Sequence, residues 1–124
     1  MKPDGERYRI CVDFDGVIHS YTSPWEHAEF IPDPPVDGAI EWLREMGRHF
    51  EVVIHTTRGR TADGAFAVKR WLHNHGLEWG LAATVTAEKV AALIYLDDRA
   101  IRFDGTNFPT RSEVHAARPW NKST

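Results

Sequence analysis

Residues 8–14, YRICVDF, decide the fold expected of this chain. A short apolar run rich in β-forming residues, followed directly by the turn signal Asp15-Gly16, is typical of a buried strand. Further along the chain, four more segments predict strands. They are FEVVIH (50–55), the weaker LAATV (81–85), the strongly apolar ALIYL (92–96) and the short IRF (101–103).

Two amphipathic segments separate these strands and predict helices. Asp37 is a plausible N-cap for the first helix, because Ile40 and Leu43 follow it at helical spacing. The second helix is expected to begin near Ala62 and to stop at 74–76, where a glycine can cap its end. Strands that alternate with helices predict βαβ units, so we expect an α/β domain with a mainly parallel sheet.

Length and composition fit one globular domain. The 124 residues carry a net charge of −3 and a single cysteine, with no basic block and no apolar run as long as a membrane span. These features predict a cytoplasmic protein with no membrane partner and no indicated nucleic-acid partner. Residues 1–7 and 118–124 are expected to be loose tails. Residues 19–35, which contain four prolines, are expected to form a loop that we call the flap.

Polar side chains follow each of the first four predicted strands. In a parallel sheet, ligands bind outside the carboxyl ends of the strands, so these residues are the candidates for a site. Asp13 and Asp15 follow the first strand, Thr56-Thr57-Arg58 the second, Thr84 to Lys89 the third and Asp97-Asp98 the fourth. The sequence therefore predicts carboxylates, hydroxyls and cationic groups at one edge of the sheet.

Four carboxylates that converge on one edge repel each other unless a cation lies between them. Oxygen ligands without histidine or cysteine favour a hard cation, most simply Mg²⁺, which binds phosphate as well. A carboxylate beside such a phosphoryl group can attack it, and a second one two residues on can protonate the leaving oxygen and later deprotonate water. Lys89 and the Thr56 hydroxyl would contact the phosphoryl oxygens.

The same residues resemble four motifs of the haloacid dehalogenase (HAD) superfamily of phosphohydrolases. VDFDGVI resembles the first motif, D-x-D-G-[TV], and Thr56-Thr57-Arg58 resembles the second. Lys89 matches the third, and Asp97-Asp98 after ALIYL matches the acidic fourth. The motifs occur in the order of the family and cover residues 8–108. The resemblance implies a three-layer Rossmann-like fold. The segments between the motifs are too short for a cap domain.

The resemblance also implies roles for individual residues. Asp13 would be the nucleophile that forms an aspartyl-phosphate, and Asp15 the general acid/base. Thr56 and Lys89 would contact phosphate. Further substrate contacts are expected at Phe14, through its backbone N–H, and at Gly16, Thr57 and Arg58. The Mg²⁺ ligands would be Asp13, the backbone carbonyl of Asp15 and Asp97, with Asp98 close to the metal.

Other interpretations stay open at this stage. Arg58 and Arg60 either bind substrate or are solvated loop residues, and Arg99 either contacts substrate or braces the acidic pair. His19 either lines the site or has no role, and Trp25 either packs or contacts a substrate or a second subunit. A phosphatase of polynucleotide ends and a non-catalytic phosphate- or metal-binding module are the alternative functions. A homo-oligomer is compatible with the sequence.

Overall fold

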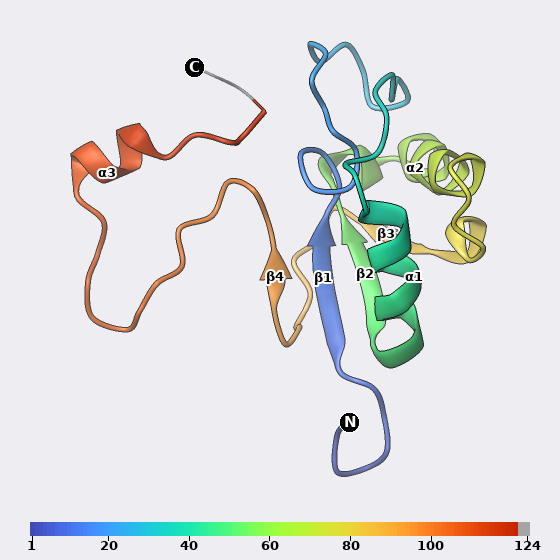
Figure 1. Ribbon diagram of the computed structural model, residues 1–124, viewed down its shortest axis with the longest axis horizontal. Helices are drawn as coiled ribbons and strands as arrows, with labels where there is room; N and C mark the ends of the chain where they lie inside the picture. The colour runs from blue at the N-terminus through green and yellow to red at the C-terminus, as the bar shows by residue number, and fades with distance from the viewer. Residues whose placement is uncertain (122–124) are drawn as a thin grey trace.

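The computed structural model describes residues 1–121 and contains one four-stranded sheet (Figure 1). Its strands are β1 (Arg9–Asp13), β2 (Glu51–His55), β3 (Thr84–Thr86) and β4 (Tyr95–Leu96). The order is β3-β2-β1-β4, and every pair is parallel. The expected α/β fold with a parallel sheet is therefore confirmed.

The core lies between the sheet and two helices, α1 (Ala39–His49) and α2 (Ala62–Asn74). Alternate strand residues face them, because side chains one position apart point to opposite sides of a strand. Val12 and Ile54 are register partners on this face, and Leu43 of α1 and Leu72 of α2 pack into the same cluster. All four are fully buried. Complete burial of each side chain stabilises the fold by roughly 1.5–3 kcal/mol.

The opposite face of the sheet has no helical layer in the described residues 1–121. The chain moves in one direction from β1 through β2 to β3, so right-handed crossovers place α1 and α2 on the same face. The return from β3 to β4 contains no helix. The last helix, α3 (Arg111–Ala116), has no buried residue and lies beyond β4 (Figure 1). Of the three layers expected, the structure has the sheet and one helical layer.

Three of the expected strands differ from the structure. The third begins at Thr84 rather than 81, because residues 80–82 form a 3₁₀ turn, η2 (Gly80–Ala82). Only Tyr95 and Leu96 of segment 92–96 form β4, and both are exposed at the edge of the sheet. The strand expected at 101–103 was wrong. By that point the chain has left the sheet edge, so the segment has no neighbouring strand to pair with (Figure 1).

The expected helices are present, with a different start for α1. Its N-cap is Gly38, with φ 84°, and not Asp37. Glycine adopts this left-handed conformation without the steric cost of a side chain. The second helix covers Ala62–Asn74 as expected, with the Thr61 side chain accepting a hydrogen bond from the backbone N–H of Gly64.

The end of the chain is attached to the loop that follows β1. The Trp120 indole N–H donates to the Gly16 carbonyl, and the Asn121 side-chain amide donates to the carbonyls of Ser20 and Tyr21, both at 2.9 Å. Residues 118–121 are therefore anchored rather than loose, while 122–124 of that expected tail lie outside the described residues. In residues 1–121, no helix combines the length and apolar character that crossing a bilayer requires.

Candidate functional site

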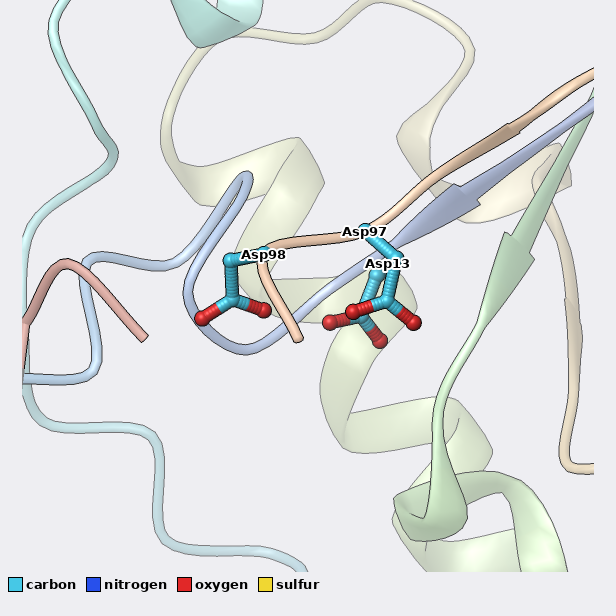
Figure 2. Close-up of side chains that lie close together, drawn as sticks. All are labelled: Asp13, Asp97 and Asp98. Carbon is cyan, nitrogen blue, oxygen red and sulfur yellow. The ribbon is translucent and has the colours of Figure 1, made fainter. Parts of the chain in front are cut away.

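Three carboxylates meet where two neighbouring strands end. Asp13 is the last residue of β1, and Asp97 and Asp98 follow β4. One carboxylate oxygen from each of the three lies within 4.8 Å of the others, and Figure 2 shows the three side chains projecting to the same side of the strands. The parallel pairing of Val12 with Leu96 produces this, since the residues that follow the pair leave the sheet together. We call Asp13, Asp97 and Asp98 the acidic cluster.

The acidic cluster is electrostatically unfavourable without a counter-charge. Burial and the carboxylates of Asp97 and Asp98 raise the pKa of Asp13 to about 8. Burial also raises the pKa of Asp98, and Asp97 adds to that shift. Asp98 Oδ1 is buried and has no hydrogen-bond partner within residues 1–121. The cluster therefore has oxygen atoms with unused acceptor capacity and a charge that a cation would relieve.

Asp15 has an environment opposite to that of Asp13. Its Oδ1 lies 2.8 Å from His19 Nδ1, and the Arg58 guanidinium donates to its carboxylate oxygens from Nε at 3.0 and 3.2 Å and from Nη2 at 3.1 Å. Although burial alone would raise it, the hydrogen bonds from His19 and Arg58 lower the pKa of Asp15 below its ordinary value. Asp13 and Asp15 are only two residues apart, yet their surroundings shift their pKa values in opposite directions.

Arg58 ties the flap to Asp15. Its side chain is 1% exposed, and its Nη1 donates to the carbonyls of Ala28 at 2.8 Å and Phe30 at 2.9 Å. The guanidinium also lies 4.7 Å from the centre of the Trp25 ring. A third flap carbonyl, that of His27, accepts from Arg58 Nη1 at 3.3 Å. One buried cation thus holds three flap carbonyls, one flap aromatic ring and the Asp15 carboxylate. The sequence left Arg58 open between substrate contact and solvated loop; the structure places it beneath the flap.

His19 is a site residue to which sequence reasoning gave no definite role. It is fully buried, and its Nε2 accepts a hydrogen bond from the Asp33 backbone N–H at 3.0 Å. Since Nε2 is the acceptor, the ring proton that remains is on Nδ1, directed at Asp15. The sequence signal for this contact is only the four-residue spacing from Asp15, which does not distinguish a loop residue from a buried one.

A pocket of about 340 Å³ joins several of the predicted residues. Its lining combines strand-end acids, loop hydroxyls, aromatic rings of the flap and one arginine: Asp13, Asp15, Tyr21, Trp25, His55, Thr56, Thr57, Asp97 and Arg99. A larger hollow of about 440 Å³, between the flap and α2, contains none of the strand-end acids. The smaller pocket is the candidate site because it contains Asp13, Asp15 and Asp97.

The residues that follow β2 are brought to this pocket. Thr56 is buried, with its hydroxyl oxygen accepting from the Arg58 backbone N–H at 3.2 Å, and it caps the short turn η1 (Thr57–Arg60). Thr57 is exposed at the pocket. Both positions agree with the expected placement at a strand end.

Phe14 and Gly16 shape the loop after β1. The Phe14 ring is buried against Trp71, and its backbone N–H donates to the His55 carbonyl at 3.2 Å, so that N–H is already used within the sheet. Gly16 has φ 90°, and a Cβ there would lie 2.2 Å from Asp98 Oδ2. Only glycine lets this turn pack directly against Asp98.

Lys89 does not join the other predicted residues. It is exposed on the connection between β3 and β4, with its Nζ 5.8 Å from the centre of the Tyr95 ring, and it is not part of the pocket lining. The interval along the chain matched the motif, but interval alone does not fix the direction of a loop without regular structure. Arg99 is the cationic residue that lines the pocket, on the segment that follows the acidic pair.

Replacing Arg58 tests its role in holding the flap. We expect Arg58→Met to lower the free energy of unfolding by about 3 kcal/mol, because Asp15 and the flap carbonyls lose a buried partner. Denaturant unfolding measures this change. Arg60→Met, on an exposed arginine of the same turn, is the matched control and should stay within about 0.5 kcal/mol of wild type. Equal effects of the two substitutions would contradict the role given to Arg58.

The acidic cluster predicts that Asp13→Asn stabilises the protein when no divalent cation is present. The raised folded-state pKa, about 8 against an ordinary 3.8, means that the unfolded chain releases the Asp13 proton more easily. Stability contributed by the protonated form is thus lost as pH rises across that interval. In EDTA, the melting temperature of Asp13→Asn should exceed that of wild type at roughly pH 9 and by less at roughly pH 5. The exposed Asp37→Asn is the control. A gap that shrinks as pH rises would refute the repulsion.

Comparisons of the chain with models of protein families, with curated proteins and with solved structures find no match. Similarity therefore identifies no family. What the structure establishes is a small α/β domain with a four-stranded parallel sheet, and a pocket at the carboxyl ends of its strands.

Proposed function

We propose that this protein is a phosphomonoester hydrolase of the HAD type, in which Asp13 is the nucleophile and Mg²⁺ is the cofactor. The observation that carries the proposal is the meeting of Asp13, Asp97 and Asp98 at the end of two parallel strands, beside a pocket that also contains Asp15 and Thr56. The order of the four sequence motifs supports the same interpretation.

The residues of the acidic cluster fit a divalent cation. All their ligand atoms are carboxylate oxygens, and one buried oxygen of Asp98 has no other partner within residues 1–121. Burial, with the neighbouring carboxylates, raises the pKa of Asp13, and a cation would offset both effects. Hard oxygen ligands of this kind suit Mg²⁺. Asp13, Asp97 and Asp98 would hold the ion. When bound, Mg²⁺ would offset the charge of the carboxylates and of the phosphoryl oxygens.

The proposed reaction has two displacements at phosphorus. The ionised Asp13 carboxylate forms a bond to phosphorus as the bond to the leaving oxygen breaks, and protonated Asp15 gives its proton to the leaving oxygen. Water then attacks the aspartyl-phosphate and gives its proton to Asp15 as the Asp13–phosphorus bond breaks. Inorganic phosphate leaves, and Asp13 is regenerated. The Thr56 side chain lines the same pocket, within which the phosphoryl group would lie.

Asp15 fits the second displacement better than the first. Arg58 and His19 keep its carboxylate ionised, which suits a base that accepts a proton from water. Protonation of the leaving oxygen requires that Asp15 carry a proton, which the Arg58 contact opposes. Substrates whose leaving group needs little protonation, such as aryl phosphates, should therefore react fastest.

A non-catalytic binding module is the second candidate function, and the position of Lys89 favours it. A phosphatase of this design uses a lysine to balance charge on the transferring phosphoryl group, but Lys89 lies over Tyr95 and outside the pocket lining. Arg99 lines the pocket and supplies positive charge there. A protein that binds a cation or phosphate without turnover needs only the acidic cluster and the loop hydroxyls.

Hydrolysis of a generic aryl phosphate distinguishes the two functions. We expect turnover with Mg²⁺, little turnover in EDTA, and a loss of at least about a thousandfold in Asp13→Asn, because the attacking atom is removed. Asp37→Asn serves as the control, as an exposed aspartate outside the pocket. Wild-type activity retained by Asp13→Asn would overturn the nucleophile. No turnover on any phosphomonoester, with Mg²⁺ binding retained, would favour the binding module.

A further inference from the structure

Trp25 is a large aromatic residue that the fold leaves exposed at the candidate site. It belongs to the flap, lines the same pocket as Asp13 and Asp15, and keeps 47% of its surface accessible. The proposed phosphoryl chemistry does not use it. The ring therefore offers the pocket an accessible aromatic surface against which a ligand can pack.

The Trp25 ring packs against the side chain of Arg58. The Arg58 guanidinium lies 4.7 Å from its centre, and Arg58 is itself fixed by Asp15 and by the carbonyls of Ala28 and Phe30. A cation over an aromatic face is an attractive contact, and it is stronger when the cation is buried, as Arg58 is. Trp25 therefore belongs to a fixed unit and is not a side chain free to sample solvent.

The rest of the flap is also anchored, which keeps the ring at the pocket. The Asp33 carboxylate accepts hydrogen bonds from the Ser23 hydroxyl at 2.6 Å and from its backbone N–H at 2.8 Å. The Ser20 hydroxyl donates to the Pro34 carbonyl at 2.7 Å. These bonds close the flap on both sides of Trp25. An aromatic surface that is ordered before binding loses little conformational entropy when a ligand stacks on it.

We infer that Trp25, backed by Arg58, is a stacking platform that selects phosphomonoesters carrying a planar ring near the phosphate, such as nucleoside monophosphates. This inference rests on the proposed function for the phosphate end of the ligand. Asp13, Asp15 and Trp25 line one pocket, so a ligand there can place its phosphate at Asp13 and its base against Trp25. Stacking of a base on an aromatic side chain strengthens binding independently of the identity of the base.

Two substrates with the same leaving oxygen isolate the contribution of the ring. AMP and ribose 5-phosphate both lose phosphate from a primary 5′ oxygen, but only AMP has a base. We expect wild type to prefer AMP in kcat/KM by about tenfold or more, mainly through KM. Trp25→Leu should reduce that preference to near unity, because it lowers kcat/KM for AMP more than kcat/KM for ribose 5-phosphate. Trp25→Phe should restore most of it.

Controls separate stacking from folding and identify the source of the nucleotide. Phe66→Leu removes an equally exposed aromatic ring on α2, outside the pocket, and should leave the preference unchanged. Thermal unfolding of Trp25→Leu and Trp25→Phe checks that both variants are folded. A 5′-phosphorylated dinucleotide, compared with AMP, shows whether the ring belongs to a free nucleotide or to a polynucleotide end. Both results are consistent with the platform.

The inference fails if wild type hydrolyses AMP and ribose 5-phosphate equally well, or if Trp25→Leu lowers both reactions by the same factor. If wild type hydrolyses neither compound, the proposed function fails on this pair and the platform is then tested by calorimetry. Binding of AMP that is about tenfold tighter than that of ribose 5-phosphate, and lost in Trp25→Leu, would support the platform alone. Equal or absent binding of the two compounds would overturn it.

Discussion

The parallel pairing of β1 with β4 is the constraint on which the site depends. It aligns Val12 with Leu96, so Asp13 at the end of β1 lies beside Asp97 and Asp98, which follow β4. The pairing of the two strands therefore brings the three acids together. Stability obtained from the sheet and the apolar core thus keeps together charges that repel each other.

Arg58 gives Asp15 electrostatic surroundings that differ from those of Asp13. Its guanidinium, with His19, stabilises the Asp15 carboxylate in its ionised form, while burial and the carboxylates of Asp97 and Asp98 raise the pKa of Asp13. The pKa values of these two neighbouring aspartates are therefore shifted in opposite directions. Opposite shifts of this kind allow two carboxyl groups of one site to take different chemical roles. Because the same guanidinium also holds flap carbonyls and the Trp25 ring, the charge state of the site and the position of the flap depend on one side chain.

Sequence patterns predicted those parts of the structure that local chemistry determines. Continuous apolar runs located β1 and β2, helical spacing located α2, and the rule for parallel sheets brought Asp13, Asp15, Thr56 and Asp97 to one pocket. Sequence patterns did not predict the features that depend on tertiary contacts. ALIYL is apolar enough for a long strand, yet an edge strand with one partner pairs over two residues only. Lys89 lies on an irregular connection, whose direction no periodicity encodes. The burial of His19 and Arg58 depends on the path of the flap over the sheet edge. The four prolines of the flap predict a loop but do not predict that path.

Isothermal titration calorimetry with Mg²⁺ near neutral pH shows whether the acidic cluster holds a cation. We expect one ion per chain for wild type, and binding at least about tenfold weaker in Asp97→Asn, which keeps the shape of the side chain but removes its charge. Asp37→Asn, on an exposed aspartate far along the chain from both strand ends, should bind as wild type does. Failure of wild type to bind Mg²⁺ at millimolar concentration, or equal binding by Asp97→Asn, would show that the carboxylates at the ends of β1 and β4 do not form a cation site.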